Sequence, residues 1–240
     1  MNFKLFQKPI LALGVFCLPQ PVLACITCDR QIREGIFNSA FGRNALLMVL
    51  PFAVLGGIVA WLAWLSGRRY KTGNAAATGA KTPVPLFSAA LILGIGTGGF
   101  IDGIVLHQVL QWHEMISAEL PPTTYVAKSI NMFWDGIFHA VTLIVSLIGI
   151  VRLWKLLHRK DIDRSGNLLA GGMLAGWALF NIVEGLFDHH LLKLHNVRER
   201  TPDVDAWNYG FLLFSVALLL AGFFIARARK PTPSNSGSDA

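Results

Sequence analysis

Five long apolar stretches run through this 240-residue sequence, and they restrict its fold more than any other feature. They are Asn44–Leu65, Leu86–Leu110, Phe133–Leu157, Asn167–Leu192 and Trp207–Ala226. At a helical rise of about 1.5 Å per residue, each can cross a hydrocarbon core of about 30 Å. None alternates as a strand would, and only 15% of residues are charged, against about a quarter in soluble domains. The sequence therefore predicts an all-α, polytopic bundle of five transmembrane helices in a lipid bilayer, with no nucleic-acid partner.

The N-terminus predicts a secretory signal peptide over residues 1–24. Lys4 and Lys8 precede an apolar core, Ile10–Leu18, that is too short to span a bilayer, and "VLA" stands directly before Cys25. Two other interpretations stay open, namely an uncleaved membrane anchor and a lipoprotein site that carries a lipid on Cys25. All three interpretations place Cys25 outside the cytoplasm.

The distribution of Lys and Arg predicts the same orientation. With residue 25 outside, the inner loops and the tail hold twelve Lys and Arg residues, and the outer segments hold seven. Cytoplasmic loops normally carry such an excess. The sequence thus predicts a bacterial inner-membrane protein whose mature N-terminus is outside and whose C-terminus is cytoplasmic.

The predicted organisation has five parts, and no internal repeat is apparent in the sequence. The parts are the signal peptide at 1–24, a CxxC segment with the first transmembrane helix at 25–66, a cytoplasmic loop at 67–85, a four-helix membrane domain at 86–228 and a cytoplasmic tail at 229–240. The tail, which includes "PTPSNSGSDA", is polar and rich in Pro and Ser, a composition typical of disorder.

Ten ionisable side chains lie in or beside three of the spans, all toward the predicted outer face. They are Asp102, Asp135, Glu184, Asp188, His107, His113, His139, His189, His190 and His195. Ionisable groups at membrane depth are costly and usually functional. From the helical rise, Asp102 and Glu184 lie about 16 Å deep, His113 and His195 lie at the rim, and the others lie about 6–12 Å deep. Three helices thus place acid and imidazole at matching levels.

Imidazole and carboxylate together are the ligand set of zinc, copper and iron. The predicted ligands of a metal site are His107, His139, and His189 or His190, with Asp135 or Asp188. Asp102 and Glu184 would orient these ligands, bind a second metal or act as a general base. His113 and His195 are either further ligands or interfacial surface residues. The alternative to a metal site is a network of Asp–His hydrogen bonds that holds the bundle together.

The motif "CITC" forms a second candidate site. Cys25 and Cys28 would lie in an oxidising compartment beside the first span. Such a pair can be a redox dithiol, a disulfide or a soft-metal site for Cu(I). The spacing alone does not choose among these roles.

Three motifs resemble an uncharacterised bacterial family of membrane proteins, the domain of unknown function 2243. The motifs are "GGFIDGIVLHQVLQWHEM", "MFWDGIFHA" and "FNIVEGLFDHHLLKLHNVRE". The resemblance covers about residues 86–228, so the CxxC segment and the first span form a separate module in front. It implies a shared polar pattern at Asp102, His107, His113, Asp135, His139, Glu184, Asp188, His189 and His195. The family often carries histidine where Glu114 and Asn196 stand here, so the resemblance implies no ligand role for these two. It implies no particular activity.

Four functions are compatible with these observations. The first is metal binding in copper handling or in the assembly of a respiratory metalloenzyme, with a respiratory oxidase or a metal-delivery protein as partner. The second is a membrane metalloenzyme, a hydrolase or oxidoreductase, that acts on a lipid-soluble substrate. The third is a haem protein with two axial histidines, and the fourth is a proton or ion conductor.

Overall fold

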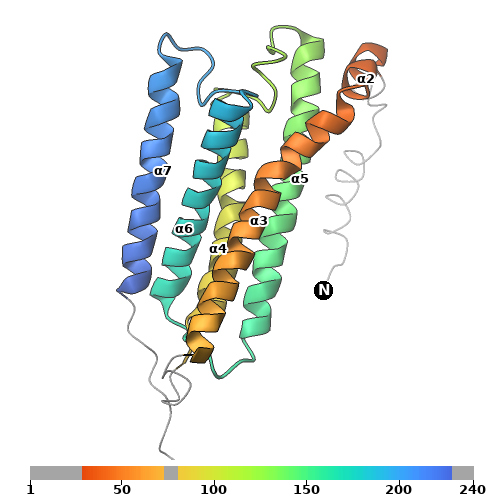
Figure 1. Cartoon of the computed structure of the whole chain (residues 1–240). Helices are drawn as coiled ribbons and strands as arrows, with labels where there is room; N and C mark the ends of the chain where they lie inside the picture. The colour runs from red at the N-terminus through yellow and green to blue at the C-terminus, as the bar shows by residue number, and fades with distance from the viewer. Residues whose placement is uncertain (1–28, 73–80, 229–240) are drawn as a thin grey trace, which may run out of the picture.

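The computed structural model of the chain describes residues 29–72 and 81–228, and this part is all-helical (Figure 1). Its elements are α2 (Arg30–Ile36), α3 (Phe41–Thr72), α4 (Val84–Ile101), η4 (Asp102–Val109), α5 (Tyr125–Leu156), α6 (Gly166–Glu184), η5 (Gly185–Leu191) and α7 (Val204–Arg227). The two η elements are π-helical continuations of α4 and α6. The predicted signal peptide, Cys25, Cys28 and the polar tail lie outside the described residues.

Five of these helical segments are long and apolar enough to cross a membrane. They are Phe41–Ser66, Val84–Val109, Tyr125–Leu156, Gly166–Leu191 and Val204–Arg227. They confirm the predicted all-α bundle of five transmembrane helices. The largest difference in a boundary is at α5, which begins at Tyr125 rather than at Phe133. The side chain of Thr124 accepts a hydrogen bond from the backbone N–H of Ala127, so the helix starts about two turns before its apolar run.

Glycines bring α4 and α6 into close contact along the middle of the bundle. A Cβ on Gly94 would clash with the backbone carbonyl of Met173, and a Cβ on Gly176 would clash with the carbonyl of Leu91. The contact is reciprocal, because aligning "DGIVLH" with "EGLFDH" places Gly94 on Gly176 and Leu91 on Met173. Small residues allow this backbone approach in membrane helices.

The outer helices of the four-helix domain, α5 and α7, pack on the inner helices through equivalent contacts. α5 packs on α4 with Gly149 against Leu93, and α7 packs on α6 with Gly222 against Ala175. Leu93 and Ala175 are equivalent in the same alignment. The hairpins α4–η4–α5 and α6–η5–α7 are therefore two copies of one unit, related by a pseudo-two-fold axis along the bundle. This corrects the expectation that the chain has no internal repeat.

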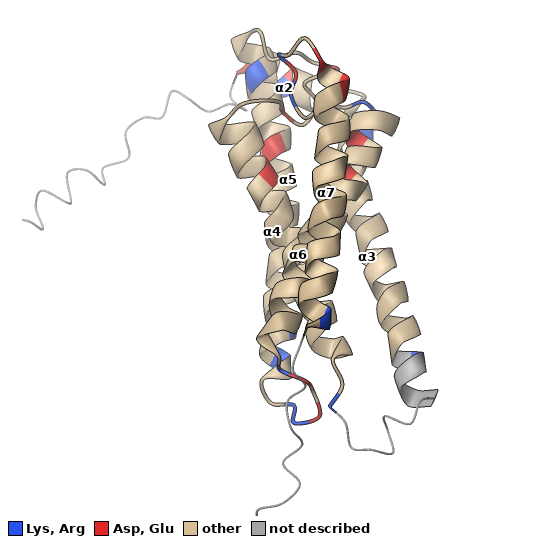
Figure 2. Ribbon diagram, turned by 90° about the vertical axis from the view of Figure 1, so that its left-hand side faces the viewer, with Lys and Arg blue, Asp and Glu red and all other residues tan. Residues whose placement is uncertain are grey.

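The N-terminal helices cover one flank of this domain. Phe52 of α3 packs against Phe138 of α5 and Phe180 of α6, with each pair of ring centroids 5.8 Å apart. α2 lies at one end of the bundle, where it contacts α5 (Figure 1). Figure 2 shows that the Asp and Glu residues within the described helices lie toward that same end. The candidate site is therefore at the end where α4 and α6 finish.

Candidate metal centre

The two inner helices end in the same unusual way. Each changes to a π-helix at an acid–glycine pair, Asp102–Gly103 on α4 and Glu184–Gly185 on α6. Bonds from residue i to residue i−5 close both π-helices, Leu110 to Val105 at 2.8 Å and Leu192 to Phe187 at 2.7 Å. Such segments are rare and are frequently found at functional sites.

The backbone then turns sharply back into the bundle. Gln111 and Lys193, which are equivalent in the two hairpins, are the two non-glycine residues with positive φ in the described chain, at 48° and 52°. This left-handed conformation is uncommon for such side chains. As a result His113 and His195 point inward and are only 2% and 0% exposed. The sequence predicted that these two histidines lie at the rim, on the assumption that each helix continues straight. The structure corrects this prediction and places both in the interior.

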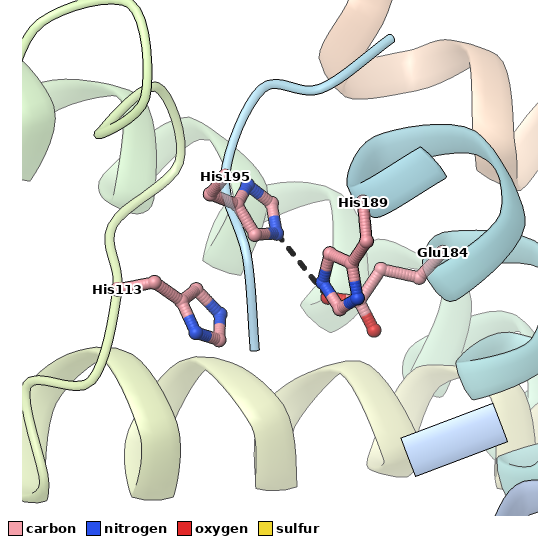
Figure 3. A group of neighbouring side chains, drawn as sticks. All are labelled: His113, Glu184, His189 and His195. Carbon is pink, nitrogen blue, oxygen red and sulfur yellow. Dashed lines mark ion pairs between the residues drawn. The ribbon is translucent and has the colours of Figure 1, made fainter. Parts of the chain in front are cut away.

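The returning histidines complete two groups of buried side chains with metal-ligand chemistry. Half-site 1 is Asp102, His107 and His113, and half-site 2 is Glu184, His189 and His195. Potential ligand atoms lie within 4.8 Å of one another in half-site 1, and do so in half-site 2 together with His113. Figure 3 shows His113, Glu184, His189 and His195 directed toward a common space.

The distances between the carboxylate oxygen and the imidazole nitrogens are similar in the two half-sites. In half-site 1, Asp102 Oδ2 lies 3.0 Å from His107 Nε2 and 4.0 Å from His113 Nε2. In half-site 2, Glu184 Oε1 lies 3.8 Å from His189 Nε2 and 3.6 Å from His195 Nε2. His113 and His195 are stacked, with ring centroids 4.5 Å apart and an interplanar angle of 3°. These two equivalent residues therefore meet at the pseudo-two-fold axis.

Backbone carbonyls orient His113 and His195 through a reciprocal exchange between the repeats. Nδ1 of His113 lies 2.8 Å from the carbonyl oxygen of Val197, and Nδ1 of His195 lies 3.1 Å from that of Met115. A carbonyl only accepts, so each Nδ1 carries the proton and donates it. This tautomer leaves the Nε2 lone pair directed into the cluster, which is the usual arrangement of a metal-binding histidine.

The remaining histidines, His107 in half-site 1 and His189 in half-site 2, differ in the groups that orient them. Asp135 Oδ1 accepts hydrogen bonds from the backbone N–H of Met115 and from His107 Nδ1, each at 3.0 Å. Asn208 is the equivalent residue on α7, and its Oδ1 accepts from the backbone N–H of Val197 at 3.0 Å. Within the described chain, His189 Nδ1 has no hydrogen-bond partner. A carboxylate therefore orients the histidine of half-site 1 alone.

Polar atoms that face the centre of the cluster lack hydrogen bonds. Among the described residues, these are Nε2 of His113, His189 and His195, Asp102 Oδ1 and Glu184 Oε2, whereas His107 Nε2 faces Asp102 Oδ2. A buried polar group without a partner costs about 1–3 kcal/mol, and more if it is charged. One bound cation at each half-site would accept lone pairs from these imidazoles and carboxylates, whereas a purely structural Asp–His network would pair them by hydrogen bonds.

His113 and His195 follow the two spans in sequence, and both are in the form that a metal requires. Burial lowers the pKa of His113 well below its ordinary value, and His107 and His195 act in the same direction. Burial also lowers the pKa of His195 to about 4, with His107 again acting in the same direction. Both imidazoles are therefore neutral at pH 7 and can donate a lone pair.

Four of the predicted ligands lie outside the two half-sites, namely His139, His190, Asp188 and Asp135. His139 Nδ1 contacts the carbonyl of Asp135 at 2.6 Å, and its ring packs against Gly103. His190 Nδ1 contacts the carbonyl of Gly185 at 2.7 Å. Asp188 is buried on η5, and its Oδ1 has no partner among the described side chains and backbone. Asp135 orients His107, whereas Asp102 and Glu184 lie among the histidines instead of beneath them.

Sequence reasoning missed several groups that complete the site. The carbonyls of Met115 and Val197 carry no signal in the sequence, because every residue has one. Asn208 could have been found by aligning the two repeats, since "DGIVLHQVLQWH" and "EGLFDHHLLKLH" share an acid–glycine pair and two histidines at identical spacing. Matching Gly149 of α5 with Gly222 of α7 then places Asp135 on Asn208. Most other positions in these segments differ, which hides the repeat.

Comparison with known proteins identifies the family but no function. A family model described as "Predicted membrane protein (DUF2243)" matches residues 89–229. No curated protein and no solved structure matches the chain. The matched region begins within α4 and contains both half-sites and the rest of both hairpins, while α2 and α3 precede it. The chain therefore belongs to the DUF2243 family of predicted membrane proteins.

Proposed function

We propose that this chain is an integral membrane metal-binding protein that holds two transition-metal ions, one at each half-site. The observation that carries the proposal is the set of buried, inward-facing imidazole nitrogens and carboxylate oxygens without hydrogen bonds within the described structure. Each half-site supplies one carboxylate and two imidazoles, which is three ligands. Three protein ligands with a further open position are typical of catalytic zinc sites.

The ligand types favour zinc or divalent iron. The two half-sites contain four imidazoles and two carboxylates, whereas Cu(I) prefers thiolate and thioether ligands. A role in copper handling would depend on Cys25 and Cys28, which lie outside the described residues. The haem alternative has less support, because the imidazole rings pack directly against one another, with the centroids of His113 and His195 4.5 Å apart, and leave no slot between them for a macrocycle.

One observation favours a metalloenzyme over a metal-delivery protein. An apolar cavity of about 480 Å³ has Asp102 of half-site 1 in its wall. A substrate dissolved in the bilayer would thus reach a metal ligand without crossing water, and a metal there would supply Lewis-acid activation. The bias of Lys and Arg supports the further proposal that the centre faces the outer side of a bacterial inner membrane.

Metal analysis of the full-length protein tests this proposal. The protein would be expressed with zinc and iron supplied, purified in detergent and measured by plasma mass spectrometry, with a visible spectrum to detect haem. We expect about two ions per chain. His195→Ala should lower the content by at least one ion, whereas the matched variant His190→Ala should leave it unchanged. A wild-type protein without metal, or a His195→Ala variant with full occupancy, would refute the proposal.

A further inference from the structure

The cavity beside half-site 1 is built for a molecule with an aromatic head. It lies between α4 with η4, α6 and α7, and its volume of about 480 Å³ is within the range of about 300–1,000 Å³ for small-molecule sites. Its walls are almost entirely apolar. The aromatic side chains in the walls are Trp112, Trp177, Trp207, Phe211 and Phe214.

Two buried polar side chains line the cavity, and both have unused acceptors. Asp102 is 4% exposed and Asn181 is 2% exposed. Asp102 Oδ2 faces the histidines of half-site 1, whereas Asp102 Oδ1 and the amide oxygen of Asn181 lack a hydrogen-bond partner in the part of the chain that the structure describes. An apolar occupant would leave these acceptors unpaired, so the occupant must bring hydrogen-bond donors.

An equivalent groove lies on the other side of the pseudo-two-fold axis, and it differs from the open cavity in two features. There α3 covers the groove, and its Phe52 packs against Phe138, the counterpart of Phe211. That groove also has Gly99 at the position where the open one has Asn181, when the two hairpins are aligned. Within residues 29–72 and 81–228, no helix covers the open groove, and this groove carries an additional polar acceptor. This difference favours a small molecule with donors over an apolar helix.

We propose that this cavity binds a lipid-soluble molecule with a hydroxyl-bearing aromatic head and an apolar tail, of the alkylhydroquinone class. The ring would lie among the indole and phenyl side chains, which favour aromatic contacts. Its hydroxyl groups would donate to Asn181 and Asp102, and its tail would leave past Phe214, which is exposed on α7. The inference rests on the proposed function only in placing the head beside a metal, because binding in the cavity does not itself require one.

Binding would be tested on the full-length protein in detergent under anaerobic conditions. The probe is 2-decyl-1,4-hydroquinone, and the matched probe is 2-decyl-1,4-dimethoxybenzene, which lacks the O–H donors. Isothermal titration calorimetry should show saturable one-to-one binding of the hydroquinone, with at least about tenfold weaker binding of the dimethoxy compound. Equal affinity for the two probes, or no saturable binding, would overturn the proposal.

Two variants assign the binding to this cavity. Gly210 lies in the cavity wall, and a Cβ there would meet no atom within 4 Å, so Gly210→Leu adds volume without a backbone clash. We expect it to abolish hydroquinone binding. Gly136→Leu on α5 is the matched control, because Gly136 is equally free of contacts and lies outside the cavity. Asn181→Leu should weaken the hydroquinone about tenfold and leave the dimethoxy compound unchanged.

Metal content separates this inference from the proposed function. Gly210→Leu should retain the metal content of the wild type, because Gly210 belongs to neither half-site. Hydroquinone binding that Gly210→Leu abolishes, in a protein without metal, would support the cavity and refute the metal centre. A metal-loaded protein whose hydroquinone binding is the same in Gly210→Leu and in the wild type would refute the cavity and leave the metal centre intact.

Discussion

The two hairpins of the membrane domain share a framework but differ around it. Both have the π-helical end, the inward turn, one carboxylate and two histidines. They differ in the residue that receives the returning backbone, Asp135 in the first hairpin and Asn208 in the second. They also differ in what covers them, since α3 covers only one of the two equivalent grooves. The shared part positions the half-sites, and the differing part makes them chemically unequal.

This inequality has a direct physical consequence for binding. In half-site 1, Asp135 orients His107 and makes its imidazole more basic, which strengthens a metal–nitrogen bond. In half-site 2, no described group contacts Nδ1 of His189 by a hydrogen bond. We therefore expect half-site 1 to bind the first ion more tightly. The open cavity lies beside the same half-site.

The largest effect is expected from substitutions that disrupt the close contact between α4 and α6, on which the symmetry of the hairpins depends. Gly94→Ala and Gly176→Ala each place a methyl group against a backbone carbonyl of the facing helix. Each should lower the free energy of unfolding by about 3 kcal/mol, and by similar amounts because the contacts are equivalent. Thermal unfolding in detergent measures the effect. Gly56→Ala on α3 is the control, because its Cβ meets no atom within 4 Å. Markedly unequal losses would argue against the pseudo-two-fold axis.

The second prediction removes the difference between the half-sites. Asp135→Asn gives α5 the residue that α7 already has, and it withdraws the carboxylate from His107. We expect about tenfold weaker binding of the tighter ion, from the usual effect of groups behind a ligand. Competition with a chelating dye measures the two affinities. If the affinities of the wild type are equal and Asp135→Asn changes neither, the assigned role of Asp135 is wrong.

The third prediction concerns the two inward turns. Gln111→Gly and Lys193→Gly should relieve about 1–2 kcal/mol of strain at positive φ. The greater freedom of glycine in the unfolded chain offsets about 0.5–1 kcal/mol of this gain. A net stabilisation of about 0.5 kcal/mol should appear in both variants as a higher unfolding midpoint. A lower midpoint in either variant would contradict the turn geometry.

The smallest effect is expected at a histidine outside the half-sites. His139→Ala should leave the metal content unchanged, because the ring contacts its own helix and Gly103. His139 and His107 have similar sequence contexts, but this substitution should leave both half-sites unaltered. Plasma mass spectrometry provides the measurement, with His107→Ala as the variant that loses an ion. Loss of metal from His139→Ala would require a ligand set different from the proposed one.

The sequence alone was sufficient for the helices and for the general place of the site. Apolar length determines a membrane span because the bilayer leaves backbone groups few alternatives to a helix. The cost of ionisable groups in lipid likewise singled out the side chains that line the candidate centre. These arguments are local, since each depends on the residues of one segment and on the surrounding solvent.

Tertiary structure alone decided which of these side chains meet. His113 and His195 enter the centre because the backbone turns back after each π-helix, and a straight-helix extrapolation places them at the rim. His107 and His139 have similar sequence contexts, yet only His107 belongs to a half-site. The carbonyls that orient His113 and His195 come from the opposite repeat, 84 and 80 residues away. Such contacts depend on how two hairpins pack together, and residue types and helical spacing do not specify that packing.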